Sequence, residues 1–134
     1  MKPFTPFNQN WAHTAPVIGV SLAAKKHDYK DRENVYHLHD LGMAMGGLLA
    51  QATHEGLHMH QMGGFDNDVI AKNFSINTAD YAIGAMFALG YQDESRLEEL
   101  GEKYQKSERE PRQRKNLNEL VFSDGFHENP HWLK

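Results

Sequence analysis

The chain has 134 residues, of which 40% are hydrophobic and 24% charged, and it contains no cysteine. This is the size and composition of one globular domain, and the lack of cysteine excludes thiolate catalysis, disulfides, iron–sulfur clusters and cysteine-based zinc sites. A net charge of −4 argues against a generally cationic nucleic-acid binder. The longest uncharged apolar run, residues 41–50, is about half of what a membrane span requires. We therefore expect a cytoplasmic protein with neither a nucleic-acid partner nor a membrane partner.

The first half of the chain predicts a strand followed by a long helix. Residues 1–15, rich in proline, asparagine and threonine, are expected to form an irregular lead-in. The continuous apolar run at 15–24 predicts a strand covered on both faces, and the charged segment 25–35 predicts a loop. From about Val35 to Glu55 the mostly apolar sequence predicts one helix, which we expect Asn34 to cap and Gly56 to end.

Three glycines lie inside this predicted helix, at positions 42, 46 and 47. Each costs about 1 kcal/mol of helix stability relative to alanine. Such a cost usually means that another backbone or a flat ligand comes close. Gly42 and Gly46 are expected to share one face of the helix.

The second half predicts two strands and two helices. Residues 57–62 alternate like a short strand, GGFD at 63–66 predicts a turn, and Asp66 is expected to cap a short helix. Residues 79–91 predict a strand. Residues 93–110 predict one charged amphipathic helix that has Leu97 and Leu100 facing inward and ends before Pro111. The tail, 112–134, is mostly polar. This order of elements indicates a mixed α+β or α/β layer fold in a single domain.

The nine histidines suggest a metal site as one alternative, with Asp40 or Glu55 as further ligands. Their spacing argues against it, because Gly56 is expected to end the helix between His54 and His58. We interpret the histidines as surface or interface residues. Those considered are His37, His39, His54, His58 and His60.

Two other features are candidates for ligand binding. Gly63 and Gly64 directly follow a predicted strand, so backbone N–H groups there can approach a flat or anionic ligand without an intervening Cβ. The alternative is a plain tight turn. Residues 102–115 hold six basic residues against three acidic ones, and the pair Arg112 and Arg114 suits a phosphate group. The alternative there is a solvated helix end.

Taken together, three segments resemble the nitroreductase family of FMN-dependent oxidoreductases. They are NWAHTAPVIGVSLA, HDLGMAMGGLLAQATHEGLHMHQMGGFD, and the stretch from ALGY through PRQRKNLNELVF. The middle segment is the most specific, because a D-x-G-x-A helix (Asp40 to Ala44) precedes a strand and a glycine turn before F-D (Met62 to Asp66). The resemblance extends from about Phe7 to Phe122.

The resemblance implies an α+β fold of three layers, with a central mixed or antiparallel sheet flanked by helices. It also implies a homodimer that binds FMN at the subunit interface, where the long helix would pack. Met62, Gly63 and Gly64 would then bind the flavin, with a backbone amide of the diglycine hydrogen-bonded near the reactive N5. Arg112 and Arg114 would bind the FMN phosphate. Valine at Gly64, where φ can be positive, would remove flavin binding and leave the fold largely intact.

The implied activity is hydride transfer from NAD(P)H, through the flavin, to a nitroaromatic, a quinone or a similar small acceptor. No side chain need act as an acid or base, which agrees with the lack of a recognisable catalytic motif. Family members normally begin with two further helices, so residues 1–134 would be one N-terminally truncated domain, the C-terminal two thirds of the fold. Such a chain would purify with little or no FMN and show at best weak NAD(P)H oxidation. The alternatives are a flavin-free remnant that serves as a binding or interaction module, and a histidine-based metal-binding protein.

Overall fold

The structure is a computed structural model that describes residues 4–29 and 31–133. It forms two compact units, Met1–Leu100 and Gly101–Lys134. Residues 1–3 of the expected lead-in lie outside the described residues. That the chain functions as one domain stays a prediction.

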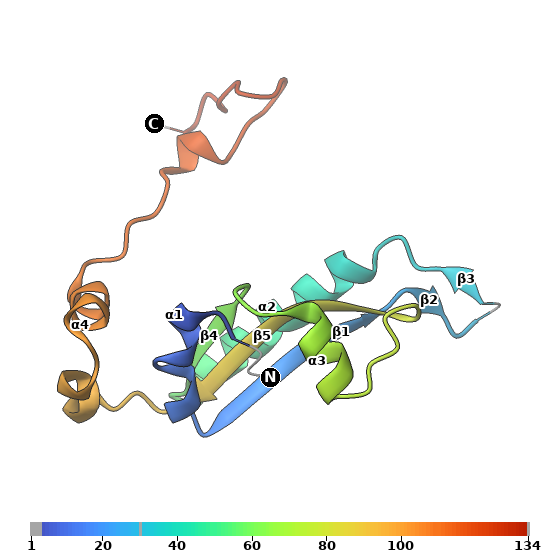
Figure 1. Ribbon diagram of the computed structural model, residues 1–134. Coiled ribbons are helices and arrows are strands. Elements are labelled where there is room, and N and C mark those ends of the chain that lie inside the picture. Colours follow the sequence, from blue (N-terminus) through green and yellow to red (C-terminus); the bar gives the residue numbers. More distant parts are fainter. Residues whose placement is uncertain (1–3, 30, 134) are drawn as a thin grey trace. The chain divides into compact units, whose positions relative to one another are not determined.

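The first unit contains a three-stranded antiparallel sheet with strand order β1-β5-β4 (Figure 1). The strands predicted at 15–24, 57–62 and 79–91 and the helix predicted at 35–55 are all confirmed. In chain order the elements are α1 (Pro6–Gln9), the 3-10 turn η1 (Ala12–Thr14), β1 (Val17–Ala24), β2 (Lys26–His27), β3 (Arg32–Glu33), α2 (His37–His54), β4 (His58–Met62), α3 (Asn67–Asn73), β5 (Tyr81–Gly90) and the 3-10 turn η2 (Glu94–Glu99).

Two segments expected to be irregular have regular structure. The lead-in forms α1 and η1, because Pro6 occupies the first helical position, where a missing N–H costs nothing, and Ala12 is fully buried in the core. The expected charged loop at 25–35 folds back as the hairpin β2–β3. An ion pair of 3.0 Å between Lys26 and Asp31 closes that hairpin.

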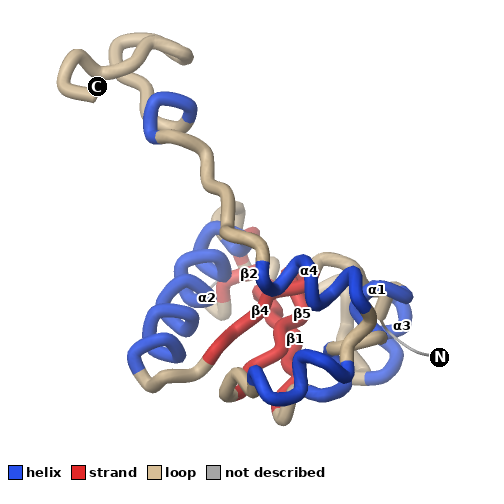
Figure 2. Tube along the Cα trace, turned by 90° about the vertical axis from the view of Figure 1, so that its left-hand side faces the viewer, coloured by secondary structure: helices blue, strands red, loops and turns tan. Residues whose placement is uncertain are grey.

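The sheet separates two layers of helix, which confirms the three-layer α+β fold. Figure 2 shows the strands between α2 on one side and α1 and α3 on the other. On the α1 and α3 side, the buried core consists of Met62, Met86 and Ala88 from the strands with Ala12 and Ile70. On the other side, α2 packs against β1, β4 and β5.

Of the two predicted ends of α2, only the C-terminal one is confirmed. Gly56 has φ +74°, and the Leu57 amide bonds the Ala52 carbonyl at 2.8 Å, so glycine ends the helix as predicted. The N-cap is Tyr36 and not Asn34. The side chain of Asn34 instead accepts a hydrogen bond from the Tyr36 amide. This contact forms an Asx turn just before the helix.

The prediction of a single helix over residues 93–110 is wrong. The structure has the 3-10 turn η2 and then, in the second unit, α4 (Glu102–Arg109). Leu100 and Gly101 between them are extended, with ψ near 150°. Glycine is a poor helix residue, and here it is the N-cap of α4. Helix α4 ends before Pro111 as predicted, and a further 3-10 turn, η3 (Leu117–Glu119), follows.

The central strand has a bulge at the place where α2 packs against the sheet. The β1–β5 register shifts between Val20 and Leu22, and at this point the Ser21 hydroxyl donates to the Ala85 carbonyl and accepts from the Ala85 amide, both at 2.9 Å. A Cβ at the neighbouring Gly84 would lie 2.5 Å from Cδ2 of Leu41. Glycine therefore lets the first half of α2 approach the sheet without a shift of the Leu41 and Ser21 side chains.

We predict that Ser21→Ala destabilises the first unit by about 1–3 kcal/mol, because both polar groups of Ala85 lose their partner in a partly buried place. Chemical denaturation would measure the free energy of unfolding. The exposed Ser107 provides the control, since Ser107→Ala should change stability little. Equal stability of the two variants would contradict the role given to the bulge.

Candidate functional site

The candidate site is the turn that follows β4. Met62 is the last residue of that strand and pairs with Met86 of β5. Its side chain is only 2% exposed and belongs to the core. Of the residues predicted to bind the flavin, Met62 can therefore offer a ligand only its backbone.

Gly63 leaves an open surface at this turn. It is exposed, and a Cβ built on it would meet no heavy atom within 4 Å. Its backbone is not left-handed, because Gly56 is the one described glycine with positive φ. The carbonyl of Gly63 accepts a hydrogen bond from the Phe65 amide at 3.2 Å. In the loop hydrogen bonds of the described residues, neither the Gly63 amide nor the Gly64 amide is a donor.

Gly64 is held by the N-terminal segment. Its carbonyl accepts hydrogen bonds from the Thr5 amide at 3.0 Å and from the Asn8 side-chain amide at 3.1 Å. A Cβ at Gly64 would lie 2.9 Å from the Thr5 hydroxyl and 3.0 Å from the Asn8 nitrogen. Valine at Gly64 would thus displace this segment, contrary to the expectation that the fold would stay largely intact.

The turn ends at α3, as the sequence predicted. One carboxylate oxygen of Asp66 accepts hydrogen bonds from the amides of Asp68 and Val69, both at 3.0 Å. The first amides of α3 are therefore satisfied by the cap. The groups left for a ligand at this turn are the amides of the diglycine.

The predicted phosphate-binding pair lies in the second unit. Arg112 and Arg114 are both exposed, in a stretch without helix or strand. One terminal nitrogen of Arg114 donates to the carbonyl of Gln113 at 3.0 Å. The predicted residues thus fall into two groups, the contiguous Met62, Gly63 and Gly64 in the first unit and the arginine pair in the second.

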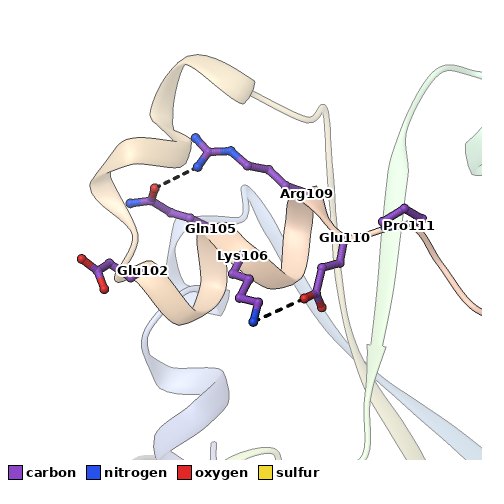
Figure 3. A pocket seen from close by; sticks show the side chains of 6 residues that line it. All are labelled: Glu102, Gln105, Lys106, Arg109, Glu110 and Pro111. Carbon is purple, nitrogen blue, oxygen red and sulfur yellow. Dashed lines mark hydrogen bonds and ion pairs between the residues drawn. The ribbon is translucent and has the colours of Figure 1, made fainter.

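A shallow hollow of about 450 Å³ lies beside α4 (Figure 3). Two acidic and two basic side chains line it, and Lys106 lies 3.7 Å from Glu110 while Arg109 donates to Gln105 at 3.4 Å. The charges in this hollow are balanced, so it has no evident preference for an anion. The lining residues are Glu102, Gln105, Lys106, Arg109, Glu110 and Pro111, and none of them belongs to the predicted site.

A second hollow, of about 390 Å³, separates part of α2 from the sheet. Gly42 and Gly46 both line it, which confirms that they share a face. Apart from its chain neighbours and the nearby backbone of the helix, a Cβ on either glycine would lie within 4 Å of no heavy atom of the described residues. The described residues therefore do not make the close approach that was expected to explain these glycines. Sequence reasoning missed the sheet side of the hollow, because Ser21, Gln61 and Gly84 meet there only through strand pairing.

The histidines do not assemble into a metal site in the part of the chain that the structure describes, where no three histidine, aspartate or glutamate side chains are placed to hold an ion. His60 instead lies edge-on to Trp11, with ring centroids 4.8 Å apart. Among the described helices, none is both long enough and apolar enough to cross a membrane.

Comparisons with known proteins agree with this fold. The structure is similar to the crystal structure of an oxidoreductase containing FMN, with a TM-score of 0.81 and 25% identity over 92% of this chain and 62% of that one. It is also similar to a nitroreductase family protein from Clostridium difficile 630, with a TM-score of 0.60 and 19% identity over 85% of this chain and 62% of that one. The chain thus spans 62% of the length of each of these two proteins.

A comparison with curated proteins gives no significant match. The family model described as the nitroreductase family matches residues 3–91. This match covers well over half of the chain and includes β1, α2, the diglycine turn and β5. The chain belongs to the nitroreductase family.

Proposed function

We propose that this chain binds FMN and acts as a flavin-dependent oxidoreductase of nitroreductase type. The observation that carries the proposal is the diglycine turn, which has an open surface at Gly63 and two amides that are not donors in the loop hydrogen bonds. The family match and the similarity to an oxidoreductase containing FMN support it. A cytoplasmic location is part of the proposal.

The residues at the turn fit a flat ring that has hydrogen-bond acceptors along its edge. With no Cβ at Gly63, the backbone can come within hydrogen-bond distance of such a ring. Bound FMN supplies the hydride-transfer chemistry itself. The chain's own contribution is to bind and orient. In the first unit, the amides of Gly63 and Gly64 would donate to the ring. Separately, Arg112 and Arg114 of the second unit would donate charge-assisted hydrogen bonds to a phosphate. We propose NAD(P)H as the donor and nitroaromatics, quinones or similar small molecules as acceptors.

The function is tested directly by titrating the purified chain with FMN. Under anaerobic conditions, NADH or NADPH should then bleach the visible absorbance of the bound flavin. Adding a nitroaromatic or a quinone should restore it. A chain that binds no FMN at any concentration tested would overturn the proposal.

Gly63→Val should weaken FMN binding by about tenfold or more, because the side chain fills the open surface and displaces at least one hydrogen bond to the ring. The fold should persist, since the φ of Gly63 is not left-handed and the space is empty. Fluorescence titration measures the affinity. As a control, Gly101→Val adds the same side chain at another exposed glycine, and unchanged FMN affinity in Gly63→Val would count against the site.

Arg112→Ala and Arg114→Ala should each weaken FMN about tenfold to a hundredfold and leave riboflavin binding unchanged, because only FMN carries the phosphate. Arg96→Ala is the matched control for loss of one positive charge. Arg96 lies 2.7 Å from Glu99, and its hydrogen bond lowers the pKa of that carboxyl. Equal weakening of FMN and riboflavin in the Arg112 and Arg114 variants would exclude a phosphate role.

We also propose that the chain forms a homodimer through α2. The outward side of this helix carries Met43, 68% exposed, with Gly47 and Ala50. Positions 43, 47 and 50 lie on one face at 100° per residue, and small residues allow a second helix to approach closely. Other exposed apolar side chains in or next to α2 are Val35, Tyr36, Leu38, Leu48 and Leu49. An apolar surface of this extent is typical of an interface, and a second copy supplies the same surface through a two-fold axis.

Met43→Glu should therefore convert the dimer to monomer or cause aggregation, which sedimentation equilibrium would detect. Met43 is a better position than Gly46, since Gly46 lines the hollow between α2 and the sheet and a charge there would also disturb packing within the chain. The control is Asn73→Lys, which places a charge on the exposed end of α3. A wild-type chain that sediments as a compact monomer at micromolar concentration would refute the dimer.

A further inference from the structure

The segment from Thr5 to Asn8 contacts the candidate flavin-binding turn across 56 residues of sequence. Asn8 is the third residue of α1 and is a polar residue only 7% exposed. Its side-chain amide donates to the Gly64 carbonyl at 3.1 Å. The Thr5 amide donates to the same carbonyl at 3.0 Å. One carbonyl of the turn is thus held by two donors from the N-terminal segment.

Neighbouring residues of both segments support this contact. Phe4 and Phe65 form an isolated antiparallel bridge, and both side chains pack against the core. Gly64 lets the segment approach, because a Cβ there would lie within 3.0 Å of Thr5 and Asn8. Asn8 is therefore buried next to a backbone that carries the candidate site.

The two hydrogen bonds fix the peptide planes that present the diglycine amides. The plane between Gly64 and Phe65 is held at both ends: its carbonyl accepts from Thr5 and Asn8, and its amide donates to the Gly63 carbonyl at 3.2 Å. That Gly63 carbonyl shares a plane with the Gly64 amide, so the direction of the Gly64 amide is fixed in turn. Two consecutive glycines would otherwise sample a wide range of φ and ψ.

We propose that Asn8, together with the backbone amide of Thr5, is a positioning residue for the flavin-binding turn. By holding the Gly64 carbonyl, it keeps the diglycine amides aimed at the ring before the ligand arrives, and binding then requires less ordering of the loop. This inference rests on the proposed function, because it concerns the same site. It assigns a binding role to an N-terminal segment that has no direct contact with the ligand in the proposal.

The test removes each donor separately. Asn8→Ala and Asn8→Asp delete the side-chain donor, the second with nearly the same shape. Thr5→Pro deletes the backbone donor at a residue whose φ of −57° already suits proline. Thr5→Val keeps the backbone amide and is its matched control. Ser21→Ala is a control for lost stability alone, because Ser21 bonds Ala85 at the sheet bulge.

We expect the Asn8 variants and Thr5→Pro to weaken FMN and riboflavin equally, by about two- to tenfold each, since the lost alignment concerns the ring and not the phosphate. The visible circular dichroism of the bound flavin should change as well. In the flavin-free chain, the amide resonances of Gly63 and Gly64 should shift and exchange faster. Thr5→Val and Ser21→Ala should leave all three measurements as in wild type.

The outcomes separate the two proposals. If wild type and all variants bind FMN with the same affinity and the same dichroism, the positioning role is wrong, while a loss in Gly63→Val would still support the flavin site. If wild type binds no FMN, the proposed function fails. The resonances of Gly63 and Gly64 then still decide whether Asn8 holds the turn: unmoved resonances in the Asn8 variants would overturn the inference.

Discussion

Strand β5 is hydrogen-bonded along both of its edges, and the rest of the first unit depends on this double pairing. On one edge, the register with β4 pairs Met62 with Met86 and so places the diglycine turn directly after a buried, paired residue. On the other edge, the register with β1 contains the bulge at which Ser21 bonds both polar groups of Ala85. The pairing with β4 gives the turn a fixed starting point.

The two faces of the sheet are covered to different degrees. On the side of α1 and α3, methionine, isoleucine and alanine side chains close a buried core. On the side of α2, a hollow of about 390 Å³ lies between the helix and the sheet, and the outward surface of the helix is itself apolar. Gly47, on that outward surface, lowers helix stability without a compensating contact among the described residues. A second copy of the chain, as proposed, would supply such a contact.

The candidate site has little side-chain chemistry of its own. Met62 is buried in the core, the diglycine has no side chains, and Asp66 caps α3. What the turn offers is backbone amides in a fixed direction. This is the arrangement expected of a protein whose cofactor carries the reaction while the polypeptide supplies binding and orientation. The N-terminal segment contributes to that orientation through a single carbonyl of the turn.

Local sequence was sufficient to predict the three main strands, the long helix, its end at Gly56 and the Asp66 cap, because these depend on hydrophobic runs and on the backbone preferences of neighbouring residues. The family resemblance supplied the layer arrangement and the candidate residues Met62, Gly63 and Gly64. The short elements were not predicted. The four-residue α1 has no periodicity, the hairpin β2–β3 consists of two-residue strands, and Gly101 interrupts a helix that the charge pattern had made continuous.

The contacts that shape the site were decided only by the tertiary structure. Asn8 and Gly64 are 56 residues apart, and nothing in the neighbourhood of either residue marks it as a partner of the other. The bulge that joins Ser21 to Ala85 spans 64 residues, and the hollow beside α2 is lined from four separate elements. Hydrogen bonds of this kind depend on the register of paired strands and on how closely a helix approaches the sheet, and both are set by packing of the whole unit and not by the residues adjacent in sequence.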